Sequence, residues 1–160
     1  MSLSDARVVA RQLGRAPRGR WRVVTRCSYG APTVIATAPL VDGQPFPTLH
    51  YLTCPHLVAA VSAIESDGGC GSWRSALAAD PALAGRLRDA DAEYRVERAR
   101  AGGGVDPTPG CGIGGERDPL GVKCLHAHVA AYLTGIADPV GESLARGLDR
   151  ECGDARCRED

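Results

Sequence analysis

The chain has 160 residues, with 19 basic and 19 acidic side chains and a formal net charge of zero at pH 7. A chain of this length can form one domain whose hydrophobic core needs no disulfides. The balanced charge argues against nucleic acid as a partner, because nucleic-acid-binding domains carry a basic face or tail. The unusual feature of the composition is its seven cysteines.

The cysteines are expected to be reduced thiols. The N-terminal segment, residues 1–14, has no apolar stretch and no small-residue cleavage motif, so we expect no secretory signal. No apolar run approaches the ~20 residues that span a bilayer, so we expect no membrane partner. These features predict a cytoplasmic protein, where thiols stay reduced. The odd number of cysteines agrees, because disulfide pairing always leaves one thiol over.

The first third of the chain predicts one helix and a small sheet. Apolar spacing indicates a helix over residues 4–13, ended by a glycine. Two short β-branched runs, residues 21–26 and 33–38, flank a turn and predict an antiparallel hairpin. Asp42-Gly43 is typical of a second turn, and residues 46–53 predict a third strand.

The remainder predicts helices separated by glycine- or proline-containing breaks. Helices are expected from Pro55 to a break at 68–71, and then over residues 73–79, 82–101, 122–134 and 138–148. Asp80 is the expected N-cap of the longest helix, whose arginines and carboxylates are predicted to face solvent. The loop at 102–121 is rich in glycine, so it predicts either a linker or a wall around a ligand.

These elements predict an α+β fold, with a small three-stranded antiparallel sheet packed against three or four helices. One domain is expected over residues 1–148. Residues 149–160 are charged and predict a frayed tail.

Three cysteines fall at predicted element junctions. Cys27 follows the first strand, Cys54 lies between the third strand and its helix, and Cys124 lies near the start of a later helix. Element ends are where distant parts of a chain converge, and thiolates with an imidazole suit zinc or an iron–sulfur cluster. His126 and His128 are the nearby histidines. Buried core packing is the alternative for any single cysteine.

The spacing leaves the histidine ligand open. On a regular helix Cys124 and His128 share a face, whereas His126 points ~200° away from Cys124. Cys124 and His126 can bind one ion only if the chain is not yet helical at Cys124. No CxxC pair strengthens the prediction, and Cys152 and Cys157 are expected to be incidental because the tail is predicted to pack against nothing.

Several stretches together resemble domain-of-unknown-function family 501, an uncharacterised and mainly actinobacterial family. They are VARQLG at 9–14, Arg26-Cys27 with Gly30 and Pro32, PFPTLHYLTCP at 45–55, GVKCLH at 121–126 and DPVG at 138–141. The resemblance covers roughly residues 7–145 and implies no established activity. Its pattern includes Cys27, Lys123, Cys124 and His126, and so favours His126 over His128.

The sequence therefore predicts a small cytoplasmic metal-binding protein. Its expected ligands for zinc or an iron–sulfur cluster are Cys27, Cys54, Cys124 and His126, with Lys123 and the glycine-rich loop as the surrounding wall. One alternative is a metal-free regulatory or protein-binding domain with structural cysteines. Another is a thiol-dependent enzyme using Cys54 or Cys124, although no catalytic residue is assigned.

Overall fold

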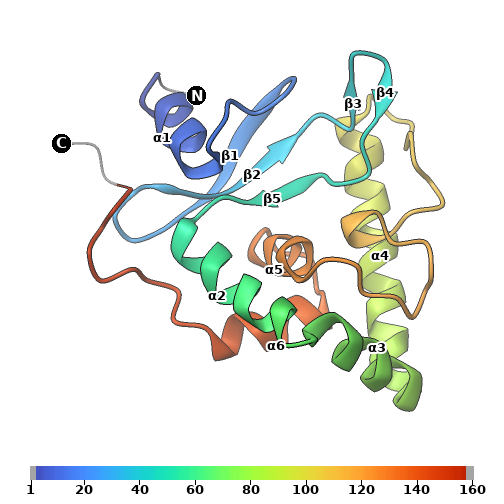
Figure 1. Cartoon of the computed structure of the whole chain (residues 1–160). Helices are drawn as coiled ribbons and strands as arrows, with labels where there is room; N and C mark the ends of the chain where they lie inside the picture. The colour runs from blue at the N-terminus through green and yellow to red at the C-terminus, as the bar shows by residue number, and fades with distance from the viewer. Residues whose placement is uncertain (1–2, 158–160) are drawn as a thin grey trace.

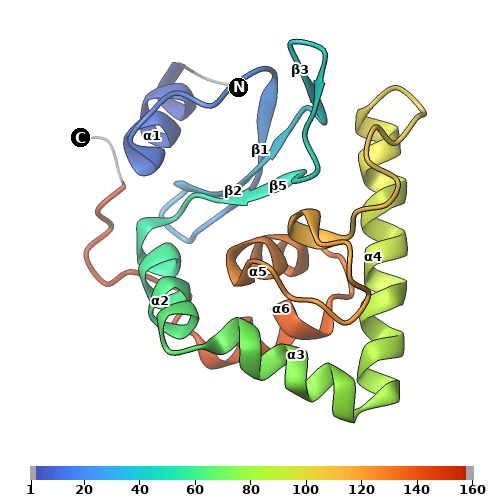
Figure 2. The same ribbon diagram turned by 45° about the vertical axis from the view of Figure 1, so that its right-hand side comes forward.

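The computed structural model describes residues 3–157. A sheet lies between helix α1 (Leu3–Leu13) on one face and a layer of further helices on the other (Figures 1 and 2). The predicted α+β fold class is confirmed. No helix among the described residues is long and apolar enough to cross a membrane.

The sheet is antiparallel, with strand order β1-β2-β5. Strands β1 (Trp21–Arg26) and β2 (Pro32–Thr37) form the predicted hairpin, whose turn is closed by Cys27 N–H donating to the Ala31 carbonyl at 3.0 Å. Val34 and Ile35 on β2 point to opposite faces and are both buried, because helices cover the sheet on both sides.

The third strand is much shorter than predicted. Only β5 (His50–Leu52) of the expected 46–53 is a strand, and the preceding chain forms a separate hairpin of β3 (Leu40–Val41) and β4 (Gln44–Pro45). Proline has no N–H, so Pro45 and Pro47 cannot donate to a continuous ladder. The Asp42-Gly43 turn joins β3 to β4, and Gly43 has a φ of +75°.

Helix α2 (Pro55–Ser66) is followed almost at once by α3 (Gly69–Ala79), so the predicted break at 68–71 is too long. Gly68, at φ +85°, makes the turn. A Cβ on Gly69 would lie 2.7 Å from the Ile64 carbonyl oxygen and 2.9 Å from Leu125, so glycine allows the helix to restart in close contact with its neighbours.

The longest helix is α4 (Pro81–Ala101), and Asp80 caps it as predicted by accepting hydrogen bonds from the Ala82 and Leu83 N–H groups. The prediction that all its charged side chains face solvent is wrong for Arg98, which is fully buried. Arg98 donates to both carboxylate oxygens of Asp106, at 2.8 and 2.9 Å. It also donates to three carbonyl oxygens, those of Pro47, Thr108 and Cys111.

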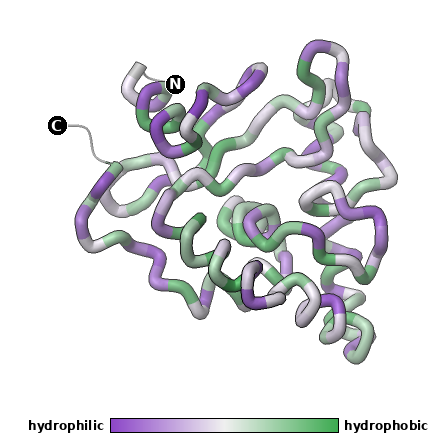
Figure 3. The backbone as a smooth tube through the Cα atoms, viewed as in Figure 1, coloured by the Kyte–Doolittle hydropathy of each residue, from purple (hydrophilic) through white to green (hydrophobic). Residues whose placement is uncertain are grey.

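Helix α5 (Leu125–Leu133) lies at the centre of the helical layer, in contact with β5, α2 and α6 (Pro139–Gly147). Its hydrophobic residues stand out in Figure 3, and most of the helix is buried. It begins three residues later than predicted, because Cys124 is extended at φ −153° and ψ 111°. The loop before it contains one short 3-10 turn, η1 (Ile113–Gly115).

The chain after α6 forms no helix or strand up to residue 157, yet Cys152 and Cys157 are buried there. Cys157 packs with Val8, Ala31 and Cys27. The part of the tail prediction that concerns residues 158–160 lies outside the described residues.

Replacing Arg98 with methionine should destabilise the fold strongly. The substitution leaves Asp106 and three carbonyl oxygens without their donor, and breaking a buried ion pair in this way costs about 3–5 kcal/mol. Urea unfolding measures the loss. The exposed Arg88→Met on the same helix is the control and should stay within about 0.5 kcal/mol of the parent. Equal stability of the two variants would contradict the role given to Arg98.

Candidate functional site

A carboxylate, a thiol and an imidazole meet where α2 ends and α5 begins. The ligand atoms of Glu65, Cys124 and His126 all lie within 4.8 Å of one another, and all three side chains are half-buried. Within residues 3–157 this is the sole group of three or more such side chains that meets this distance. The site joins one residue of α2 to two that are close together in the sequence.

The extended backbone at Cys124 brings His126 to the thiol. His126 Nδ1 lies 3.9 Å from Cys124 Sγ and 3.2 Å from Glu65 Oε1. His128 lies on the other side of the helix, where its Nδ1 is 2.8 Å from Asp138 Oδ2 and the ring is buried. Cys124 precedes the first residue of α5 and is not helical, so its side chain can lie next to His126. The geometry therefore pairs Cys124 with His126 and not with His128.

The second nitrogen of His126 fixes the tautomer. Nε2 lies 3.2 Å from the Val58 carbonyl oxygen and 3.1 Å from Ser62 Oγ. A carbonyl oxygen only accepts, so Nε2 carries the proton that is donated to it. Because the pKa of His126 is raised to about 9, Nδ1 also carries a proton at pH 7 and faces Glu65 as a donor. Once that proton is lost, the Nδ1 lone pair is directed toward Cys124 and Glu65.

Two helix ends hold Glu65 in place. It lies in the last turn of α2, where a negative side chain is disfavoured by the partial negative charge of the helix C-terminus. Its Oε1 accepts a 2.6 Å hydrogen bond from the Leu125 N–H, the first N–H of α5. The hydrogen bond from the N-terminus of α5 therefore offsets the repulsion between the Glu65 carboxylate and the C-terminal end of α2.

The site is rich in negative charge and raises the pKa values of the groups around it. The hydrogen bond with Cys124 raises the pKa of His126 to about 9; burial opposes this shift and the charge of Glu65 adds to it. Burial, followed by the charge of Glu65, raises the pKa of the nearby Cys70 thiol. The charge of Glu65 contributes to both shifts, after a larger effect of the Cys124 hydrogen bond on His126 and of burial on Cys70.

The predicted ligands are divided between two places. Cys124 and His126 lie together, whereas Cys27 and Cys54 line a different cavity. Cys54 precedes the first residue of α2 and Glu65 lies near its last, which puts roughly 16 Å of helix between the two places. Lys123 is exposed beside Cys124.

The glycine-rich loop contacts Cys124. A Cβ built on Gly114 would lie 3.7 Å from the Cys124 Cβ, so the loop packs directly against the thiol-bearing residue. Ile113 N–H donates to Asp91 on α4 and holds the loop there.

Glu65 and Cys70 were not identified from the sequence. Glu65 is 59 residues from Cys124 in the sequence, and only the fold brings the two together. Cys70 is close to Glu65 in the sequence, but it was assigned to a glycine-rich break rather than to the first turn of α3. The single turn at Asp67-Gly68, after which the helix restarts at Gly69, places Cys70 in the first turn of α3.

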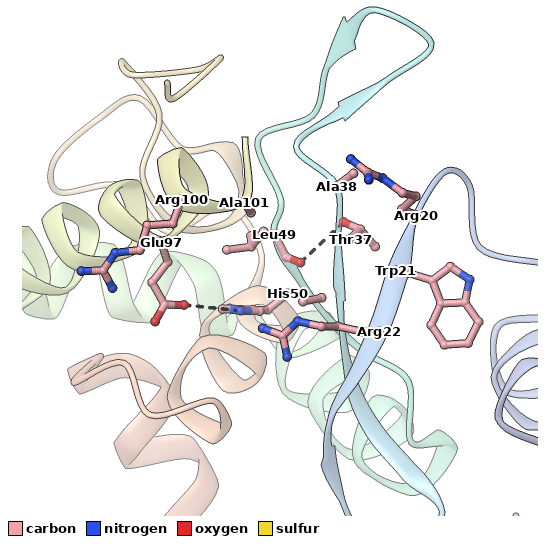
Figure 4. A pocket seen from close by; sticks show the side chains of 11 residues that line it. Arg20, Trp21, Arg22, Thr37, Ala38, Leu49, His50, Glu97, Arg100 and Ala101 are labelled. Carbon is pink, nitrogen blue, oxygen red and sulfur yellow. Dashed lines mark hydrogen bonds and ion pairs between the residues drawn. The ribbon is translucent and has the colours of Figure 1, made fainter. Parts of the chain in front are cut away.

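A cavity of about 530 Å³ lies elsewhere, between the sheet and the C-terminal part of α4 (Figure 4). Within it, His50 Nε2 is 3.7 Å from Glu97 Oε2. Burial, with a smaller effect of Arg22, lowers the pKa of His50 to about 4, so this contact is not an ion pair at pH 7. Figure 4 shows that Arg22 and Glu97 extend toward His50, whereas the Trp21 and Arg100 side chains turn away from it.

Comparison with protein families identifies the chain. The model of the family described as protein of unknown function (DUF501) matches residues 23–146, which is most of the sequence. The chain belongs to this family. The matched segment contains Glu65, Cys124 and His126. No curated protein and no solved structure matches the chain.

The buried His50 should titrate far below an ordinary histidine, and NMR should show a midpoint near pH 4 rather than near about 6.5. Because its pKa is lower in the fold than in the unfolded chain, protonation favours unfolding. The free energy of unfolding should therefore fall as the pH drops from about 6.5 toward 4, and His50→Gln should flatten this dependence. A His50 midpoint at the ordinary value would contradict the buried neutral ring.

Proposed function

We propose that this chain is a small cytoplasmic zinc-binding protein whose ligands are Glu65, Cys124 and His126. The observation that carries the proposal is the convergence of their oxygen, sulfur and nitrogen atoms within 4.8 Å. Zinc binds such atoms at about 2.0–2.3 Å, so two ligand atoms of one tetrahedral ion lie roughly 3.3–3.8 Å apart, and small side-chain movements bring these three atoms to that separation. Sulfur, imidazole and carboxylate donors are also the set that zinc uses most.

The surroundings of His126 support the same assignment. A zinc-bound histidine commonly donates its other N–H to a backbone carbonyl, which fixes the ring and its tautomer. Here Nε2 faces the Val58 carbonyl oxygen at 3.2 Å, and Nδ1 is left for the ion. The hydrogen bond with Cys124 raises the pKa of His126 and the charge of Glu65 adds to this shift, so the site favours a positive charge, which a bound cation supplies.

Three protein ligands leave a fourth coordination position. Cys70 is a further thiol beside the site, where it interacts with Glu65 and with the Leu125 N–H that donates to Glu65. With Cys70 as the fourth ligand the site is closed and structural, and with water it is open in the way catalytic zinc sites are. Cys70→Ser distinguishes these forms, because only the closed form loses zinc affinity.

Zinc affinity, measured by competition with a chromophoric chelator, tests the proposal. Glu65→Gln, Cys124→Ser and His126→Gln should each weaken binding by about 100-fold or more, since even residues behind the ligands contribute about 10–100-fold. Ser62→Ala, which removes a contact to His126 Nε2, should fall in that smaller range. Cys111→Ser is the control and should bind zinc normally. Cys111 is buried in the loop that contacts Arg98 of α4 and is not one of the proposed ligands.

A folded protein that takes up no zinc from excess metal would overturn the proposal. It would instead support the metal-free binding domain, in which these side chains are structural.

The 3.9 Å contact between Cys124 Sγ and His126 Nδ1 favours a second function, that of a thiol-dependent enzyme. An imidazole next to a cysteine stabilises the thiolate, which is the reactive nucleophile. This function predicts that iodoacetamide modifies Cys124 selectively near neutral pH in chelator-treated protein, and that His126→Gln slows the reaction. Mass spectrometry of the peptides measures it. Alkylation spread evenly over the exposed and half-buried thiols would exclude an activated Cys124.

A further inference from the structure

Four further cysteines face one small cavity away from this site. Cys27, Cys54, Cys152 and Cys157 line it together with Gln12, and three of the four thiols are buried. The cavity volume is about 10 Å³. That is about the space that one water-sized particle needs, so the cavity suits a single ion and not a multi-iron cluster.

The four thiols come from three separate parts of the chain. Cys27 begins the turn between β1 and β2, and Cys54 immediately precedes α2. Cys152 and Cys157 lie in the chain after α6, which Figures 1 and 2 show running past the start of α2 toward α1. Thiol groups of Cys157 and Cys152 are close enough to Cys54 to influence its ionisation.

Hydrogen bonds hold this C-terminal segment against α1, α2 and the turn of the first hairpin. His56 Nε2 lies 2.9 Å from the Asp149 carbonyl oxygen, and Ser28 Oγ donates to Glu151 at 2.7 Å. Arg11 donates to the Cys157 carbonyl oxygen at 3.2 Å. The cavity wall thus includes residues that α1, the hairpin and α2 hold in place.

Beyond these hydrogen bonds, the segment buries few side chains. Figure 3 shows that it alternates hydrophilic and weakly hydrophobic residues, and two thiols are its buried apolar groups among residues 149–157. Ordering each residue costs more conformational entropy than one exposed hydrogen bond returns. In addition, the buried Gln12 Oε1 has no hydrogen-bond partner among the described residues, although its cavity is lined by thiols.

We propose that Cys27, Cys54, Cys152 and Cys157 bind one Zn²⁺ as four thiolates, and that this ion fastens the C-terminal segment to the sheet and α2. The tail pair has four residues between its cysteines, which is a spacing found in structural zinc sites. This centre is separate from the Glu65, Cys124 and His126 site and does not depend on it.

Binding at this centre requires small adjustments. No three of the four sulfurs lie within 4.8 Å of one another, so the cysteine side chains rotate inward to reach the tetrahedral Zn–S distance of about 2.3 Å. Each thiol releases its proton to solvent on binding, and the resulting centre carries two negative charges. Arg156, which interacts with Cys152 and Cys157, lies near enough to offset part of this charge.

Metal analysis of the full chain, purified under reducing conditions with zinc in the medium, tests the proposal. The double variant Cys152→Ser/Cys157→Ser should contain one zinc ion fewer per chain than the parent, and Cys111→Ser should match the parent. The double variant Glu65→Gln/Cys124→Ser should keep the zinc that the tail variant loses. If the earlier proposal alone is wrong, the parent holds one zinc, which the tail variant loses and the Glu65 and Cys124 variant keeps.

Unchanged zinc in the tail variant would overturn the proposal, as would iron with acid-labile sulfide. A second measurement needs no variant. When Co²⁺ replaces zinc in the parent, a four-thiolate centre gives intense visible bands and sulfur-to-metal charge transfer, characteristic of tetrahedral cobalt. Peptide mapping should show all four cysteines protected from alkylation until chelator is added. A Cys152–Cys157 disulfide in the reduced, zinc-grown protein would contradict the assignment.

Discussion

The buried guanidinium of Arg98 determines the path of the chain around the candidate site. A charge with no access to water must be neutralised and fully hydrogen-bonded, so Asp106 and the Cys111 carbonyl oxygen are drawn to it. These contacts fold the glycine-rich loop back along α4. The loop then reaches Asp91, packs Gly114 against Cys124 and leads directly into α5.

Helix α2 separates the two proposed centres. Cys54 lies before its first residue and Glu65 lies in its last turn, so one rigid element carries a ligand of each site. Each end meets a different part of the fold: the hairpin and C-terminal segment at one end, and the start of α5 at the other. The family match over residues 23–146 includes all of the first site but stops before Cys152 and Cys157. The second centre therefore depends on a segment beyond the matched region.

Local signals in the sequence were sufficient for the fold class and most elements. Asp80, which directly precedes Pro81, caps α4 as predicted. Asp138 caps α6 by accepting a hydrogen bond from the Val140 N–H. The first hairpin also formed as predicted, with β2 shifted by one residue. Errors arose where distant groups intervene. The expected strand at 46–53 is interrupted by Pro47, whose carbonyl oxygen accepts a hydrogen bond from Arg98.

The sequence by itself determined that cysteines stand at element ends, because caps, turns and apolar spacing act over a few residues. Only the tertiary structure decided which of these cysteines meet. Glu65 joins Cys124 across 59 positions, and the C-terminal thiols join Cys27 and Cys54 across much of the chain. These side chains meet because of the length of α2, the late start of α5 and the buried charge of Arg98 on α4. Such features arise when the elements pack together, so the proposed metal-binding residues show no regular spacing along the sequence.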